Sequence, residues 1–347
     1  MCKSKSIFVI FLLIINFSFS NENKIKEFKG FFDFSYDESK DKIFLQVDKL
    51  DHEFLYVGSL ASGVGSNDIG LDRGQLGSER LVKFIKKGNK LLLVEPNLYF
   101  RAETKNISEK KSVQQAFAKS VIFGFEIINT NDNHYLIDFT PFLMFDRHGV
   151  AKRLRDTKQG SYKVDKSKSA VEINNTKAFP NNVEFEALLT FSGEAKGNLI
   201  KSVAPDADNI TVFQHHSFIK LPDNNYNLRK FDTRSGAISI SYMDYSSPIE
   251  DPITKKYVIR HRLEKKNPEL EISEAIEPII YYLDPGTPEP VKSALLDGGR
   301  WWNQAYESIG FKDAFQVKIL PEGIDPLDCR YNVIPWVHRS TRGWSYG

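Results

Sequence analysis

The sequence predicts an α+β fold in which a large, mostly antiparallel β region precedes the start of an α/β domain. In residues 28–145, apolar and polar side chains alternate in short runs, as they do in half-buried strands. Similar runs recur over residues 182–247. From residue 272 the pattern changes to an apolar run, a long helical stretch and a second apolar run. That order is typical of α/β domains.

Residues 1–20 have the features of a secretory signal peptide. Two lysines precede an apolar stretch from Ile7 to Ile15, and Ser18 and Ser20 are the small residues expected before a cleavage site. The stretch is short for a membrane span, which needs about 20 residues. We therefore expect cleavage after Ser20, export to the periplasm, the outer surface or the medium, and no transmembrane span in the mature chain.

The composition is that of a globular protein with several buried cores, since 41% of the residues are hydrophobic. The 47 basic side chains nearly balance the 45 acidic ones, and no long block has one sign. Nucleic acid is therefore not an expected partner. Removal of the leader takes Cys2 with it and leaves only Cys329. The mature chain can form no internal disulfide and must be stabilised by its cores.

The β region is punctuated by turn sequences. Gly88-Asn89 and Asn131-Asp132-Asn133 each separate two apolar runs, which predicts hairpins. Residues 112–121 have helical spacing and predict one helix that crosses the sheet. Residues 150–182 are rich in Lys, Asp, Ser and Asn and predict a solvated excursion or linker. Residues 21–265 as a whole are expected to form a sandwich or an open barrel.

A glycine-rich stretch covers residues 63–77. A phosphate-binding loop would need a Gly-Lys-Ser/Thr ending before a helix, and none is present. We expect a structured loop in which glycine supplies turns and positive φ angles.

The α/β pattern is clear in residues 272–347. Ile279–Leu283 predicts a strand that ends at an Asp-Pro-Gly turn, and residues 288–309 predict a helix that opens with prolines. Residues 315–320 predict a second strand.

The histidines do not form a zinc motif. Zinc hydrolases commonly place two histidines one helical turn apart with a glutamate between them. His52-Glu53-Phe54-Leu55-Tyr56 is the nearest sequence, but Tyr56 stands where the second ligand belongs. His215 and His216 lie in a predicted strand, so their rings point to opposite faces and cannot chelate together. We expect both to be surface or half-buried histidines.

Nucleophilic catalysis has no clear candidate either. The chain lacks a Gly-x-Ser-x-Gly elbow, and Cys329 with His338 forms a pair without a positioning third group. Asp325 and Asp328 are predicted to be turn residues. The sequence therefore assigns no catalytic, cofactor-binding or metal-binding residue.

Several long blocks nevertheless resemble one family over nearly all of residues 28–347. They include GVGSNDIGLDRGQLGSERLVKF, DTRSGAISISYMDYSSPI, VIRHRLEKKNPE and PIIYYLDPGTPEPVKSALLDGGRWWNQAYESIGFKDAF. The family comprises exported bacterial zinc-dependent metalloproteases in which DUF5118 and DUF5117 regions precede a metzincin-like catalytic domain. The resemblance implies that residues 21–265 are the DUF5118/DUF5117-like region and residues 272–347 the truncated N-terminal part of the peptidase domain. It also implies that residues 331–337 form the third strand of that domain.

The same resemblance implies a zinc cofactor and a polypeptide substrate for the intact enzyme. The family's His-Glu-x-x-His helix would lie beyond Gly347, so we expect this chain alone to bind no zinc and to be inactive. We expect the sequence to be a fragment of a longer protein. In metzincin-like enzymes an edge strand pairs with the extended substrate. Gly343, Trp344, Ser345 and Tyr346 are the candidates for the start of that edge, and a plain connecting turn is the alternative.

A non-catalytic function is the competing hypothesis. The β region would then be a surface or periplasmic module that binds polypeptide or glycan, as its 13% aromatic content allows. A third hypothesis makes residues 21–265 a folding aid or pro-region that covers the catalytic cleft. DNA that continues in frame to His-Glu-x-x-His would favour the enzyme.

Overall fold

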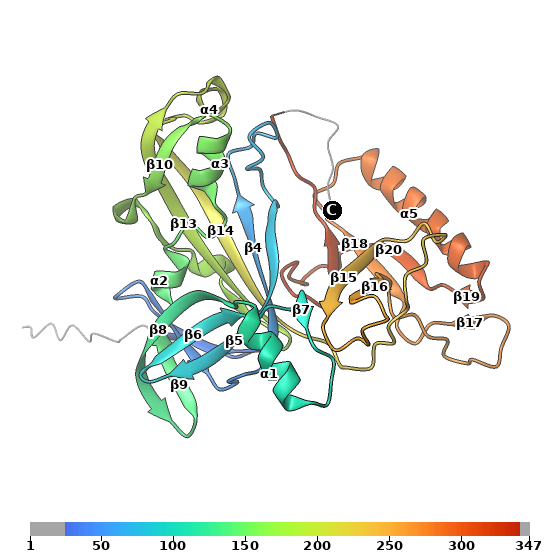
Figure 1. Cartoon of the computed structure of the whole chain (residues 1–347). Helices are drawn as coiled ribbons and strands as arrows, with labels where there is room; N and C mark the ends of the chain where they lie inside the picture. Colours follow the sequence, from blue (N-terminus) through green and yellow to red (C-terminus); the bar gives the residue numbers. More distant parts are fainter. Residues whose placement is uncertain (1–24, 341–347) are drawn as a thin grey trace, which may run out of the picture.

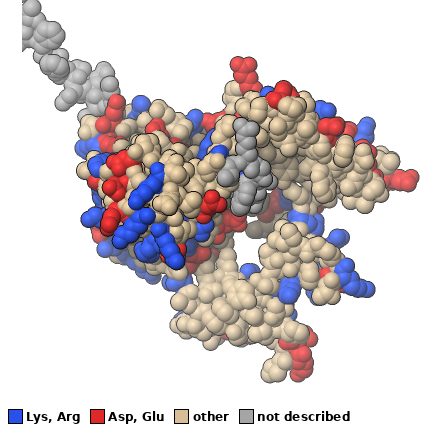
Figure 2. All heavy atoms as spheres, turned by 90° about the horizontal axis from the view of Figure 1, so that it is seen from above, with Lys and Arg blue, Asp and Glu red and all other residues tan. Residues whose placement is uncertain are grey.

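The computed structural model describes residues 25–340 and confirms an α+β fold dominated by antiparallel strands. A large curved sheet forms one side of the molecule, and a smaller unit of three strands and a helix, orange to red, lies beside it (Figure 1). Basic and acidic side chains are both spread over the face shown in Figure 2, in line with their nearly equal numbers.

The large sheet contains thirteen strands in the described residues, and every neighbouring pair is antiparallel. In spatial order the main path is β1 (Ile25–Phe28), β2 (Asp33–Asp37), β3 (Lys42–Val47), β9 (His134–Asp138), β8 (Ser120–Asn131), β6 (Lys90–Glu95), β5 (Leu76–Lys87), β4 (Phe54–Ser62), β14 (Asn209–Lys220), β13 (Asn182–Ala195) and β10 (Gly160–Val164). Two short strands, β11 (Ala170–Val171) and β12 (Lys177–Ala178), also pair with β13.

The two ends of this sheet come together. The N–H of Phe31, between β1 and β2, donates to the carbonyl of Phe179, just after β12, at 2.9 Å. The rings of Phe34 on β2 and Phe185 on β13 lie 4.9 Å apart. The sheet therefore curls almost into a barrel around one interior, which is the open-barrel alternative of the sequence prediction.

Aromatic side chains fill that interior. Phe139 is fully buried, and its ring centroid lies 5.0 Å from Phe142, 4.8 Å from Phe185 and 5.6 Å from Phe218. A one-turn helix, α2 (Thr140–Leu143), carries Phe142 and Leu143 into the core. Aromatic rings at these separations stabilise a core beyond the area they bury.

Residues 150–182 are not a linker, so that prediction is wrong. They form α3 (Val150–Asp156), β10, the 3₁₀ turn η1 (Lys166–Lys168), β11, a second 3₁₀ turn η2 (Ile173–Asn175) and β12. The three short strands each pair with β13, one after another along its length. The side chains of Asp165 and Glu172 cap the two turns that interrupt this edge. Capping and solvent exposure explain why residues 150–182 have the polar composition that is typical of a linker.

The remaining elements of the β region are short. The helix predicted over residues 112–121 is present only in part, because α1 (Ile107–Ala116) ends at Ala116 and β8 begins at Ser120. A further short helix, α4 (Asn198–Val203), follows β13. A separate three-stranded sheet contains β16 (Thr254–Val258), β15 (Ser239–Asp244) and β7 (Phe100–Arg101).

The C-terminal unit is parallel, in contrast to the rest of the chain. β18 (Ile279–Leu283) is central, with β20 (Phe315–Ile319) on one side and β21 (Asn332–Ile334) on the other. Helix α5 (Val291–Glu307) connects β18 to β20 and packs on β20 through stacked rings of Tyr306 and Phe315, 5.8 Å apart. The strands and helix predicted from the sequence are all present, although β21 is shorter than expected. A small parallel pair joins β17 (Ser273–Glu274), which precedes β18, to β19 (Phe311–Lys312), which follows α5.

Loops after β20 and β21 attach this unit to the β region. Lys177 forms an ion pair with Asp325 at 2.5 Å, and the amide of Asn182 donates to the carbonyl of Leu327 at 2.8 Å. Farther along, Arg339 pairs with Asp72. Among the helices of residues 25–340, none has the length and apolarity required to cross a membrane.

Candidate functional site

The most buried charges of the described chain lie on the outer face of β13 and β14. His215 stands directly across from Glu186 in the strand register. Its Nδ1 lies 2.9 Å from a Glu186 oxygen and its Nε2 lies 2.7 Å from a Glu184 oxygen. All three residues are at most 4% exposed. We refer to Glu184, Glu186 and His215 as the Glu-His-Glu cluster.

Neighbouring side chains satisfy the remaining carboxylate oxygens of the cluster. Asn182 donates to the second oxygen of Glu184, and Asn175 of η2 donates to the second oxygen of Glu186 at 2.8 Å. Ser217 donates to the Glu184 oxygen that also contacts His215. Asn182 also accepts from the N–H of Cys329 at 3.2 Å. The cluster is thus linked by hydrogen bonds to the edge strands and to the C-terminal unit.

The pKa values of the two adjacent histidines are shifted in opposite directions. Burial alone would lower the pKa of His215, but the hydrogen bonds to Glu184 and Glu186 outweigh it and raise that pKa to about 9. Burial, with the charges of His215, Arg147 and His148, holds the pKa of His216 well below its usual range. Both are buried, so the prediction of surface or half-buried histidines is wrong. Their rings do face opposite sides of β14, as predicted.

The Glu-His-Glu cluster is structural. Both nitrogens of His215 are occupied by carboxylates, so neither can accept a proton from a substrate or coordinate a metal. A buried charged group is costly unless it is paired and hydrogen-bonded, and this one is fully paired. The arrangement can fix the register of β13 against β14.

A different site lies where β4 and β5 meet the glycine-rich loop that connects them. A cavity of about 310 Å³ opens there between the two strands, the loop and α3. Three arginines and one histidine line it, and no Asp or Glu among residues 25–340 does. The basic and aromatic lining residues are Arg80, Arg147, His148, Arg153 and Tyr56. We refer to this site as the arginine-lined cavity. Such a lining favours an anionic ligand.

The glycine-rich loop is structured, as expected, and it shapes this cavity. Gly65, Gly70 and Gly74 have φ angles of +76°, +73° and +82°, which favour glycine. A Cβ on Gly70 would lie 2.5 Å from Nη2 of Arg153. Glycine at this position therefore lets the guanidinium lie against the loop, where its Nε donates to the carbonyl of Ile69.

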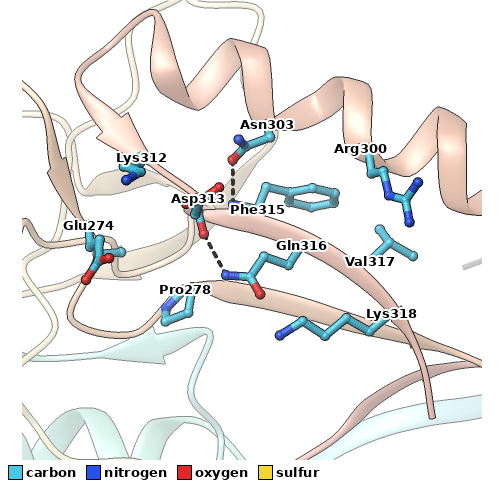
Figure 3. Close-up of a pocket in the computed structure, with 11 residues that line it drawn as sticks. Glu274, Pro278, Arg300, Asn303, Lys312, Asp313, Phe315, Gln316, Val317 and Lys318 are labelled. Carbon is cyan, nitrogen blue, oxygen red and sulfur yellow. Dashed lines mark hydrogen bonds between the residues drawn. The ribbon is translucent and has the colours of Figure 1, made fainter.

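A second cavity, of about 740 Å³, runs along β20 in the C-terminal unit (Figure 3). Arg300, Lys312 and Lys318 line it together with Glu274 and Asp313, so its charge is mixed. Asn303 of α5 accepts the N–H of Phe315 at 3.3 Å, and Gln316 donates to the carbonyl of Asp313 at 2.8 Å, as the dashed lines in Figure 3 show. β20 pairs with β18 on one side and, within residues 25–340, with no strand on the other.

The substrate-edge candidates Gly343, Trp344, Ser345 and Tyr346 lie outside the described residues, and the predicted signal peptide does too. That assignment remains a prediction. Cys329 is exposed, and partial burial with the charges of Asp328 and Glu184 raises the pKa of its thiol. A raised pKa does not suit a nucleophile.

Asp325 and Asp328 are turn residues, as predicted. Asp325 accepts the N–H of Leu327, and Asp328 forms an ion pair with Arg330.

Sequence reasoning missed the cluster and the arginine-lined cavity. Glu184 and Glu186 occupy alternate positions of an otherwise apolar strand, a pattern that signals buried charge only when a cation lies across from it. The sequence around Arg147 and Arg153 gives no sign of a site, because the other residues that line the cavity come from β4, β5 and the loop between them.

These observations define an α+β protein with a curled antiparallel sheet, an internal charge cluster and a basic cavity. Residues 74–266 match the model of a family described as a domain of unknown function, DUF5117. The match spans more than half of the chain, which therefore belongs to this family. Comparison with curated proteins and with solved structures found no match.

Proposed function

We propose that this chain supplies the leading β region and the start of the catalytic domain of an exported zinc-dependent metalloendopeptidase. The observation that carries the proposal is the C-terminal unit, in which consecutive parallel strands take the spatial order β20-β18-β21 with α5 as the crossover. Its strands and helix coincide with the segments whose sequences resemble the opening of a metzincin-like domain.

The contacts between the two regions support a scaffold role for the β region. Lys177 and Asn182, at the edge of the large sheet, bind the loop that leads into β21 through Asp325 and Leu327. The N–H of Ser340 donates to the carbonyl of Gly65 in the glycine-rich loop at 2.8 Å. The β region thereby orients the third strand of the unit and the chain that follows it.

Residues 25–340 contain no cluster of side chains to which a zinc site can be assigned. No group of three or more His, Cys, Asp or Glu in residues 25–340 could hold a metal ion. A catalytic zinc needs three protein ligands and an open position for water. We therefore assign no step of peptide hydrolysis to these side chains, and the proposal places the zinc ligands and the general base in residues that follow Gly347.

The test compares two recombinant proteins, the chain ending at Gly347 and a version extended by the coding sequence that follows it. We expect one tightly bound zinc and chelator-sensitive cleavage of denatured casein only in the extended protein. An extended protein that folds but neither binds zinc nor cleaves peptide bonds would overturn the proposal.

A second candidate function is polypeptide binding without catalysis. The open edge of β20 favours it, because an extended peptide can add to such an edge by backbone hydrogen bonds. The adjoining cavity would accept alternate side chains of the peptide. Val317→Pro would remove one N–H of β20. Weaker capture of an unfolded polypeptide by this variant than by Val333→Pro on β21 would favour the binding function.

A further inference from the structure

The arginine-lined cavity has more positive charge than its surroundings neutralise. Arg80 is paired with Glu95 at 2.7 Å. Asp146, which precedes Arg147 in the chain, accepts three backbone N–H groups at the start of α3. Neither carboxylate lines the cavity. Arg147 and Arg153 are therefore left facing this space without a carboxylate partner within it.

Arg147 is held in place by apolar contacts. Its guanidinium lies over the rings of Phe123, Phe142 and Phe145, with centroid distances of 4.9, 4.7 and 4.7 Å. Nη1 donates to the carbonyl of Ile122 at 3.2 Å, whereas the buried Nε has no hydrogen-bond partner in residues 25–340. Burial, with the nearby charge of Arg80, lowers the pKa of Arg147. An anion in the cavity would offset both costs.

A chain of hydrogen bonds orients a further donor into the cavity. The amide oxygen of Gln214 accepts the N–H groups of Arg147 and His148, each at 2.8 Å, so its NH₂ group must face His216. Nε2 of His216 then accepts from Gln214, which puts the imidazole proton on Nδ1, 3.0 Å from the hydroxyl of Tyr56.

The hydroxyl of Tyr56 therefore accepts from His216 and keeps its own proton for donation. Burial raises the pKa of Tyr56 to about 12, against the opposing charges of Arg147 and Arg80, so the hydroxyl stays protonated at neutral pH. Tyr56 lines the cavity. Its O–H is a neutral donor placed beside the arginines, as expected at a site that recognises an oxyanion.

We propose that the arginine-lined cavity binds a small oxyanion, a phosphate or a carboxylate group, held by Arg147 and Arg153 and by the hydroxyl of Tyr56. Guanidinium groups suit both anions, because each presents two oxygens to a planar pair of donors. The volume of about 310 Å³ fits a single small ligand. This site goes beyond the proposed peptidase function and requires neither zinc nor catalysis.

The test is calorimetric titration of the purified full chain with inorganic phosphate in one arm and succinate in the other, at low ionic strength. We expect saturable binding of one anion per chain in at least one of the two titrations. Binding of phosphate or of succinate shows whether the site takes a phosphate or a carboxylate group. Arg153→Gln should weaken binding about tenfold, which corresponds to about 1.4 kcal/mol. Tyr56→Phe should weaken it less, because a neutral donor is lost rather than a charge.

Arg155→Gln is the matched control. Arg155 lies on the same helix, is exposed and does not line the cavity, so its loss removes the same charge without touching the site. Circular dichroism of each variant checks that the fold is retained. The proposal is overturned if the folded chain binds neither anion, or if Arg153→Gln and Arg155→Gln weaken binding equally.

Discussion

Nε2 of His215 lies 2.7 Å from the carboxylate of Glu184 on the neighbouring strand, and both side chains are almost fully buried. With Glu186 on the other ring nitrogen, the histidine is a cation held between two anions in the wall of the sheet. This relationship makes the stability of the β region depend on pH in a defined direction.

The first prediction concerns that pH dependence. The pKa of His215 is about 9 in the folded chain and about 6.5 in an unfolded chain. The folded state binds the proton more tightly, so the contribution to the free energy of unfolding is complete below pH 6.5 and is lost as pH rises through 9. The difference amounts to about 3 kcal/mol. His216 is neutral in both states above about pH 7.5 and does not contribute there.

Urea unfolding at pH 7.5 and pH 9.5 measures this effect. Wild type should lose stability between the two values, whereas His215→Gln should be less stable at pH 7.5 and nearly insensitive to the change. Equal losses in both proteins would show that His215 does not carry the proton.

A second prediction concerns the junction of the two regions. Asn182→Ala removes the hydrogen bonds to Leu327 and Cys329, each contributing about 1 kcal/mol. Hydrogen exchange over residues 325–334 should then become at least about fivefold faster. Asn174→Ala, an exposed residue of η2, is the control and should leave that exchange unchanged. Unaltered exchange in Asn182→Ala would remove this contact from the scaffold account.

The third prediction concerns the aromatic core. Phe139→Ala removes a fully buried ring that contacts four others and should lower the free energy of unfolding by about 3–5 kcal/mol. Phe145→Ala makes the same chemical change at a residue that is 53% exposed, and the loss should stay below about 1 kcal/mol. Similar losses for the two variants, measured by denaturant unfolding, would contradict the position of the core.

Export gives a fourth prediction. N-terminal sequencing of the protein recovered from the periplasm or the medium should begin at or near Asn21, because Ser18 and Ser20 meet the small-residue requirement of a signal peptidase. Recovered protein that still begins at Met1 would contradict cleavage of the leader.

Local patterns in the sequence were sufficient for much of the fold. Alternation predicted the antiparallel strands, and the Asp-Pro-Gly turn with its prolines predicted where β18 ends and α5 begins. The structure of residues 150–182 could not be predicted in this way. Its strands have two to five residues between capped 3₁₀ turns and are too short to show an alternation of apolar and polar side chains. Pairing with β13 stabilises them, and that partner is not visible locally.

The candidate sites depend even more on distant segments. The burial of His215 could not be predicted from its neighbours in the sequence, because both of its carboxylate partners come from β13, directly across from it. The arginine-lined cavity combines β4, β5, α3 and the loop that ends at His148. Residues so far apart in the chain give no spacing from which a site could be predicted.

The most direct test of the proposed function is the state of the native protein. An antibody raised against residues 25–340 would isolate it from the producing cells, and mass spectrometry under native conditions would give its mass and metal content together. The account predicts a chain longer than 347 residues, without its leader, that carries one zinc ion and hydrolyses peptide bonds until a chelator is added. A native chain that ends at Gly347, carries no zinc and cleaves no peptide would contradict it.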